Sequence, residues 1–195
     1  MKRNIYLVFS FTGTLLSRII KRTTKDSYAH VSISLEDNFE KMYSFGRKHP
    51  SNPIWAGLVT ENLFEGVFKN FKNSQCLVYK IEITEEQYNQ LEIELNKFMG
   101  EQNKYRYNFA GLIALKFNKT LKRKYHYFCS QFVSELLHKS EILYLNKPPE
   151  LTKPCELINI ENKIFVFEGS IKDFNAFLKN KKINYENSDY INNTI

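Results

Sequence analysis

The 195-residue sequence has few cysteines, and the three present, Cys76, Cys129 and Cys155, form no Cys-x-x-Cys pair. A disulfide framework or a four-thiolate zinc site is therefore not expected, and a reducing compartment fits best. Glycine and proline are also scarce, at seven and five residues, which excludes collagen-like and linker-dominated chains. With 43% hydrophobic and 15% aromatic residues, the chain can build a substantial core without disulfides or a structural metal.

Long apolar runs and a secretion signal are absent as well. No stretch approaches the roughly 18 apolar residues of a membrane span, and the run at residues 5–9 is short and lacks a small-x-small cleavage site. We therefore expect a cytoplasmic protein without a transmembrane segment, which would reach an external cell wall only through lysis or a partner. Acidic residues are fewer than basic ones, and the net charge of +7 favours anionic surroundings such as cell-wall polymer, acidic lipid or nucleic acid.

The patterning predicts one α+β domain over residues 1–184 and a polar, flexible tail over residues 185–195. Mostly antiparallel strands are expected at residues 5–10, 30–35, 39–45, 77–83 and 164–167, with residues 36–38 as the turn of a hairpin. Helices are expected at residues 15–21, 85–99, 109–117, 129–139 and 171–178, and a capping box begins the second of them. Residues 47–71, with two prolines and two glycines, are expected to form a long irregular excursion.

The strongest chemical signal is Cys129, which opens the helix predicted at residues 129–139. Apolar residues follow it at plus three, four, seven and eight, so the thiol faces inward. The unpaired N–H groups and the dipole of a helix N-terminus favour the thiolate, and they could receive the oxyanion of an acyl-transfer intermediate. Free cysteine is also among the most buried residue types, so packing is the alternative role for Cys129 and the expected role for Cys76 and Cys155.

His30 can supply the base that a nucleophilic cysteine needs. It begins the strand predicted at residues 30–35, on the face opposite Val31 and Ile33. If residues 36–38 form the hairpin loop, Ser44 lies directly across from His30. We therefore predict that Ser44 orients the imidazole.

Two motifs, YAHVSI at residues 28–33 and YFCSQFV at residues 127–133, resemble the circularly permuted branch of the NlpC-type papain-like cysteine peptidases, with YNFAGLI at residues 107–113 as a supporting fragment. That branch includes YiiX-like proteins and lecithin:retinol acyltransferase relatives, and its His strand precedes its Cys helix. The resemblance implies a permuted papain-like fold, in which an antiparallel sheet packs against the helix that carries the cysteine. It makes Cys129 the nucleophile, His30 the base and Ser44 the third polar residue, where relatives usually have a carboxylate, an amide or a second histidine.

The resemblance implies hydrolysis of an amide, in a peptide, an isopeptide or a cell-wall peptide, through a Cys–His thioester and with no metal or organic cofactor. An acyltransferase or lipid-directed thiol enzyme of the same fold is one alternative, and a non-catalytic binding module is another. Substrate-binding side chains are expected at Arg47, Tyr28, Tyr107 and Trp55. Arg47 could grip a carboxylate bidentately, and Trp55 could help to wall an apolar groove for a lipid.

A basic segment precedes the Cys helix and contains Lys116, Lys119, Lys122, Arg123 and Lys124. These cations are expected either to form a solvated loop or to attract an anionic substrate. No recognised nucleic-acid module accompanies them, so no nucleic-acid partner is expected. The His-x-x-Cys pair formed by residues 126 and 129 could be half of a zinc site, but the sequence offers no second half.

Overall fold

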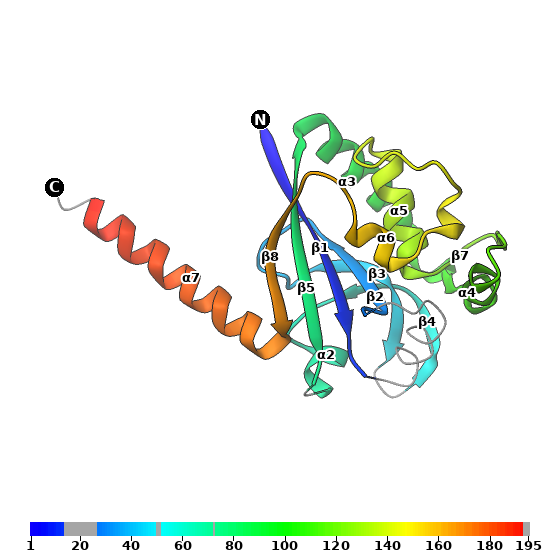
Figure 1. The fold of residues 1–195 in the computed structure, drawn as a ribbon, viewed down its shortest axis with the longest axis horizontal. Helices are drawn as coiled ribbons and strands as arrows, with labels where there is room; N and C mark the ends of the chain where they lie inside the picture. The colour runs from blue at the N-terminus through cyan, green and yellow to red at the C-terminus, as the bar shows by residue number, and fades with distance from the viewer. Residues whose placement is uncertain (14–26, 50–51, 72, 193–195) are drawn as a thin grey trace.

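A six-stranded antiparallel sheet in the order β4-β3-β2-β1-β5-β8 forms the centre of the protein (Figure 1). The structure is a computed structural model that describes residues 1–13, 27–49, 52–71 and 73–192. The expected α+β class, with mostly antiparallel strands, is confirmed. The strands of the sheet are β1 (Lys2–Phe11), β2 (His30–Ser34), β3 (Met42–His49), β4 (Asn52–Glu61), β5 (Gln75–Thr84) and β8 (Lys163–Ser170).

Apolar side chains are buried on both faces of this sheet. The larger cluster joins strand residues such as Phe9 and Val31 to Phe132 of α5 (Cys129–Lys139), and the smaller one joins Val8 and Met42 to residues at the start of α7 (Ile171–Asn192). Figure 1 shows α5 with α3 (Glu85–Gly100) and α6 (Pro154–Ile158) on one side, whereas α7 extends away from the sheet. The sheet is therefore a middle layer, and α5 belongs to the larger core.

Short elements complete the described chain. They are α2 (Gly66–Asn70), the 3₁₀ turns η1 (Gln102–Lys104) and η2 (Pro149–Leu151), α4 (Phe109–Lys116) and the parallel pair β6 (Arg106–Tyr107) and β7 (His126–Tyr127). The pair β6–β7 matters for the site because β6 leads into α4 and β7 leads into α5. Within the described ranges, no helix combines the length and the apolar character needed to cross a bilayer.

The two helices predicted most sharply are confirmed. Thr84 and Gln87 form the predicted capping box of α3, with the Gln87 N–H 3.2 Å from Thr84 Oγ1 and the Thr84 N–H 3.0 Å from Gln87 Oε1. Helix α5 begins at Cys129, as predicted, but Phe128 at its N-cap offers no side-chain acceptor. The N–H groups in the first turn of α5 are thus left without a side-chain cap.

Two sequence predictions about chain path differ from the structure, and a third concerns residues outside those that it describes. Where an irregular excursion was expected at residues 47–71, the described residues include the end of β3, the edge strand β4 and the helix α2, because β4 pairs with β3 along most of its length. Helix α7 continues past residue 184 to Asn192, into the predicted tail, since no glycine or proline interrupts it. The predicted helix at residues 15–21 lies outside the described residues.

A close backbone approach at Gly57 holds β4 in place, and we expect Gly57→Ala to destabilise the fold by about 2 kcal/mol. A Cβ atom at this position would lie 2.6 Å from the Tyr105 carbonyl oxygen, so the backbone itself would have to shift. Urea unfolding measures the effect. Gly100→Ala is the matched control, because a Cβ there meets nothing within 4 Å, and it should leave stability unchanged or slightly raised. Equal stability of the two variants would contradict the prediction.

Candidate active site

The site centres on the Cys129 thiol, which lies beside the imidazole ring of His30 and interacts with it electrostatically. Cys129 comes from the first turn of α5, and His30 is the first residue of β2. The two predicted catalytic residues are therefore neighbours in space although they lie far apart in the sequence. The cysteine is only 2% exposed, whereas the side chains of His30 and Glu61 are 18% and 15% exposed. Solvent thus reaches the site from the side of the imidazole.

Glu61, the last residue of β4, holds the other side of the imidazole. Its two carboxylate oxygens lie 3.1 and 3.0 Å from His30 Nε2, which leaves Nδ1 as the ring nitrogen that can serve the sulfur. The Ser32 hydroxyl donates a 2.7 Å hydrogen bond to the same carboxylate and fixes its orientation. Cys129, His30 and Glu61 therefore lie in the order thiol, imidazole and carboxylate, an arrangement that could supply a nucleophile, a base and an orienting group.

The electrostatics of this chain favour a charged imidazole. Burial lowers the pKa of His30, but the charge of Glu61 and hydrogen bonds with Cys129 and Glu61 outweigh it and raise the pKa to about 10. Burial raises the pKa of Glu61, but the charge of His30 and hydrogen bonds from His30 and Ser32 bring it below its ordinary value. An imidazolium between a carboxylate and a sulfur stabilises the thiolate form of the nucleophile.

Ser44 does not take the role predicted for it. The observed register pairs Ile33 with Tyr43, so the two strands are offset by two residues from the predicted pairing. The loop is longer than expected because Phe39 has φ of 57° and is buried in the smaller core, which delays the start of β3 to Met42. The Ser44 hydroxyl instead donates a 2.6 Å hydrogen bond to the Val31 carbonyl oxygen. This hydrogen bond links β3 to β2 outside the two residue pairs of their short ladder.

Gly46 makes room for the His30–Glu61 pair. A Cβ atom at position 46 would lie 2.8 Å from Glu61 Oε1 and 3.5 Å from His30 Cε1. Any larger residue would compete with the carboxylate for its position beside the imidazole. The absence of a side chain at Gly46 is therefore part of the geometry of the site.

The Tyr107 hydroxyl lies beside the sulfur. Burial, and secondly the neighbouring Cys129, raise the pKa of Tyr107 well above its ordinary value. Within the described ranges, the hydroxyl makes no hydrogen bond of regular geometry, so its contact with the sulfur is a loose one. A buried O–H group without a firm acceptor can donate to an oxygen atom that forms next to the sulfur during a reaction.

The other three predicted binding residues are distributed differently. Arg47 is close enough to Glu61 to lower the pKa of that carboxyl, and its guanidinium carbon lies 5.6 Å from the centroid of the Phe71 ring. The Tyr28 hydroxyl donates a 2.7 Å hydrogen bond to Glu168 on β8, a structural contact. Trp55 is 57% exposed on β4. Tyr107 and Arg47 are thus associated with the catalytic chain by a contact or a charge interaction.

The metal alternative rested on the His-x-x-Cys pair of residues 126 and 129. Nδ1 of His126 lies 2.7 Å from the Lys124 carbonyl oxygen. In the ranges that the structure describes, no group of three or more His, Cys, Asp or Glu side chains is arranged to hold a metal ion. The cysteine is instead surrounded by a base and a hydroxyl.

Glu61 is the member of the candidate site that the sequence did not predict. A signal was present, because an apolar run at residues 55–59 ends in Thr60 and Glu61, as a strand that closes with a carboxylate would. The nearby prolines and glycines obscured it. Comparison with known proteins adds no further guide, since no family model, no curated protein and no solved structure matches this chain.

Proposed function

We propose that the protein is a cysteine-dependent hydrolase that cleaves an amide through a thioester on Cys129, and that its fold is a permuted papain-like one. The observation that carries the proposal is that the Cys129 thiol lies beside the imidazole of His30, whose Nε2 lies 3.0 Å from a carboxylate oxygen of Glu61. Relatives in the family that the motifs resemble usually have a carboxylate, an amide or a second histidine as the third residue. Glu61 supplies a carboxylate there, as Ser44 would not. The order of the chain, with the His strand before the Cys helix, supports the permuted arrangement.

The chemistry follows from these positions. His30 already holds the proton as an imidazolium, and the thiolate of Cys129 attacks the carbonyl carbon to form a carbon–sulfur bond. First-turn N–H groups of α5 and the Tyr107 hydroxyl would stabilise the resulting oxyanion. The carbon–nitrogen bond then breaks as His30 returns the proton to the leaving amine. Water, deprotonated by His30, attacks the thioester, and the carbon–sulfur bond breaks to regenerate the thiolate.

The test is acylation by a p-nitrophenyl ester, because this activated probe needs no knowledge of the natural substrate. We expect a burst of nitrophenolate near one equivalent and an acyl group located on Cys129 by peptide mass spectrometry. Cys155, a partly exposed thiol outside the site, serves as the internal reference. The variant Cys129→Ala should lose the burst. Acylation confined to Cys155, or none, would overturn the proposal in favour of a non-catalytic binding module.

The same acyl-enzyme separates hydrolysis from acyl transfer. If water resolves the thioester, turnover continues without an added acceptor. An acyltransferase would accumulate the Cys129 thioester until an amine or alcohol acceptor is supplied. Release that depends strictly on such an acceptor would assign the protein to the acyltransferase alternative, with the same three residues in the same roles.

Tyr107→Phe provides a direct test of the oxyanion donor. We expect the acylation rate to fall about 100-fold, in the range found when one such donor is removed. Stability should be unchanged or slightly higher, because the variant removes a buried hydroxyl that lacks a firm partner. Burst kinetics and urea unfolding measure the two effects. Tyr28→Phe is the control, since its hydroxyl serves Glu168, and it should keep the acylation rate. A rate unchanged in Tyr107→Phe would exclude the role.

A further inference from the structure

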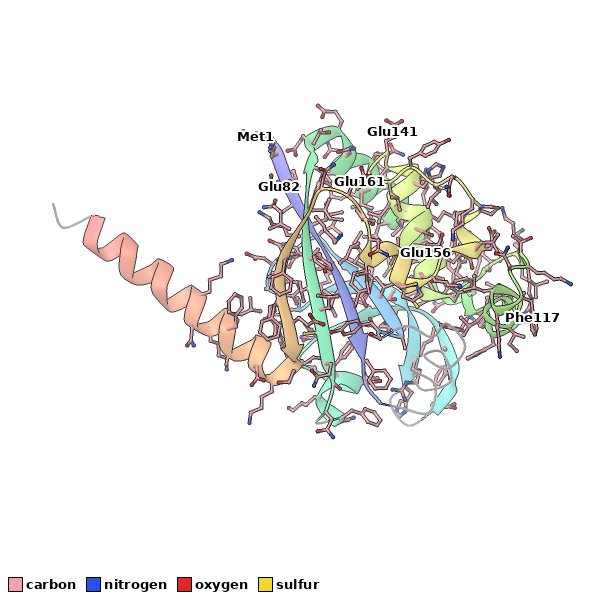
Figure 2. The ribbon with its side chains drawn as sticks, in the orientation of Figure 1. Met1, Glu82, Phe117, Glu141, Glu156 and Glu161 are labelled. Carbon is pink, nitrogen blue, oxygen red and sulfur yellow. The ribbon has the colours of Figure 1, made fainter. Side chains whose placement is uncertain are left out.

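Three large apolar side chains are exposed on α4 and the loop that follows it. Ile113 is 61% exposed, Phe117 is 66% exposed and Leu121 is 39% exposed. Ile113 and Phe117 are four residues apart, so they lie one turn from each other on the same side of the helix. Figure 2 shows Phe117 at the border of the molecule opposite to the end from which α7 extends. Water-exposed apolar clusters of this kind mark interaction surfaces.

The chain around these side chains is strongly basic. Between Glu101 and Glu135 there are seven lysine and arginine residues and no acidic residue. Five of these cations lie within residues 116–124, and all five are exposed. The exposed apolar side chains are therefore interspersed along the chain with positive charge, which complements an anionic surface.

Hydrogen bonds hold this loop in a defined shape. Asn108 caps α4 by accepting a 3.0 Å hydrogen bond from the Gly111 N–H, and its amide nitrogen donates a 3.0 Å bond to the Leu121 carbonyl oxygen. The Lys119 N–H donates to the Ala114 carbonyl oxygen at 3.0 Å. The loop is thus fastened to both ends of α4, and Phe117 and Leu121 are presented without a large ordering cost on binding.

We propose that the α4 surface, defined as Ile113, Phe117 and Leu121 with the cations of residues 116–124, docks on an anionic lipid bilayer. The three apolar side chains would enter the interface between headgroups and acyl chains, and the lysines would contact the anionic headgroups. A nucleic acid would also attract the cations, but it would leave the aliphatic Ile113 and Leu121 in water. The combination of exposed aliphatic and basic side chains therefore favours lipid.

The surface is connected to the candidate site through both strands of the β6–β7 pair. Tyr107 of β6 lies directly before the Asn108 cap of α4, and β7 runs from the basic loop into Cys129. Docking would bring the nucleophile close to the bilayer. The docking itself requires no catalysis, so Cys129→Ala should bind vesicles as the wild-type protein does, and failure of one proposal leaves the other testable.

The experiment is sedimentation of the full chain with phosphatidylcholine vesicles that contain phosphatidylserine, compared with vesicles of phosphatidylcholine alone. We expect binding to the anionic vesicles only, weakened by salt. Replacing two cations, in Lys119→Gln/Lys122→Gln, should weaken it by at least about tenfold. Replacing two apolar side chains, in Ile113→Ser/Phe117→Ser, should weaken it by at least about tenfold without changing net charge. All four side chains are exposed, so both variants should keep wild-type unfolding curves.

Matched controls carry the same substitutions elsewhere on the surface. Lys69→Gln/Lys172→Gln removes two exposed cations, and Ile93→Ser/Tyr144→Ser removes two exposed apolar side chains; both should bind like the wild type. If the control variants lose as much vesicle affinity as the test variants, binding depends on overall charge or hydrophobicity and not on the α4 surface, and the proposal is overturned. Absence of any vesicle binding would also overturn the proposal. If the Ile113/Phe117 variant binds vesicles normally while the Lys119/Lys122 variant loses affinity for single-stranded DNA, the surface would instead be assigned to nucleic acid.

Discussion

The variant His30→Ala should alkylate Cys129 with iodoacetamide about 100-fold more slowly than the wild-type protein at neutral pH. The charged imidazole of His30 lies next to the Cys129 sulfur, and alanine removes both this charge and the ring. We expect the wild-type protein to react well below pH 8, where an ordinary thiol is mostly protonated. Quantitative mass spectrometry of the labelled peptides gives the rate for each cysteine separately.

The other two cysteines make this experiment self-controlled. Burial raises the pKa of Cys76 to about 12, so this thiol should stay unlabelled while the protein is folded. Labelling of Cys76 in the variant would report unfolding instead of a lost base. His138→Ala, at an exposed helix end, should behave as the wild type does. An equal Cys129 rate in His30→Ala with Cys76 still protected would refute the assignment of His30 as the base.

The variant Glu61→Gln should move the titration of His30 from about pH 10 towards its ordinary value of 6.5. Glutamine keeps the size and can keep one hydrogen bond, but it removes the negative charge that stabilises the imidazolium. NMR of the imidazole C–H resonances, assigned with His30→Ala, measures the shift. The variant should also lose about 3 kcal/mol of stability near pH 6, because the imidazolium is left without its partner in a largely buried site.

This stability loss should depend on pH in a defined direction. The folded pKa of His30 is raised, so its contribution is full below pH 6.5 and is lost as the pH rises towards 10. The folded pKa of Glu61 is lowered, so its contribution is present above pH 4.5 and is lost as the pH falls below that value. The difference between wild type and Glu61→Gln in urea unfolding should therefore be largest between pH 4.5 and 6.5.

Glu94→Gln is the matched control for this variant. Glu94 is a nearly buried carboxylate on α3 that pairs with Lys97 at 2.6 Å and Lys139 at 3.7 Å. The same substitution there should lower stability while leaving the His30 titration and the Cys129 alkylation rate unchanged. A Glu61→Gln variant that still titrates near pH 10 would show that Glu61 does not set the charge of His30.

The sequence could predict the elements whose signals are local. The start of α5 at Cys129 follows from the spacing of its apolar residues, and the start of α3 follows from the Thr84 capping box. His30 and Cys129 were also identified correctly as neighbours, although this rested on motifs and not on spacing. Each of these signals lies within about a dozen residues of chain.

The carboxylate of the site could not be found in the same way. Its position depends on how β4 pairs with β3, and that pairing depends on a loop in which Phe39 adopts a positive φ to bury its ring. A hairpin register shifts by two residues without moving any side chain to the other face, so alternation alone could not distinguish Ser44 from the observed arrangement. The pairing of distant strands, which no short sequence motif encodes, therefore determines that Glu61 is the third residue of the candidate site.

The three members of the site are contributed at very different times during synthesis. The imidazole and its carboxylate are both made within the first third of the chain, on strands that can pair early, whereas the sulfur arrives with a helix made much later. A nascent or truncated chain that ends before residue 129 would hold a paired base and no nucleophile. The sulfur can therefore meet the imidazole only after α5 has docked, so fast labelling of Cys129 while Cys76 stays protected would report completed folding.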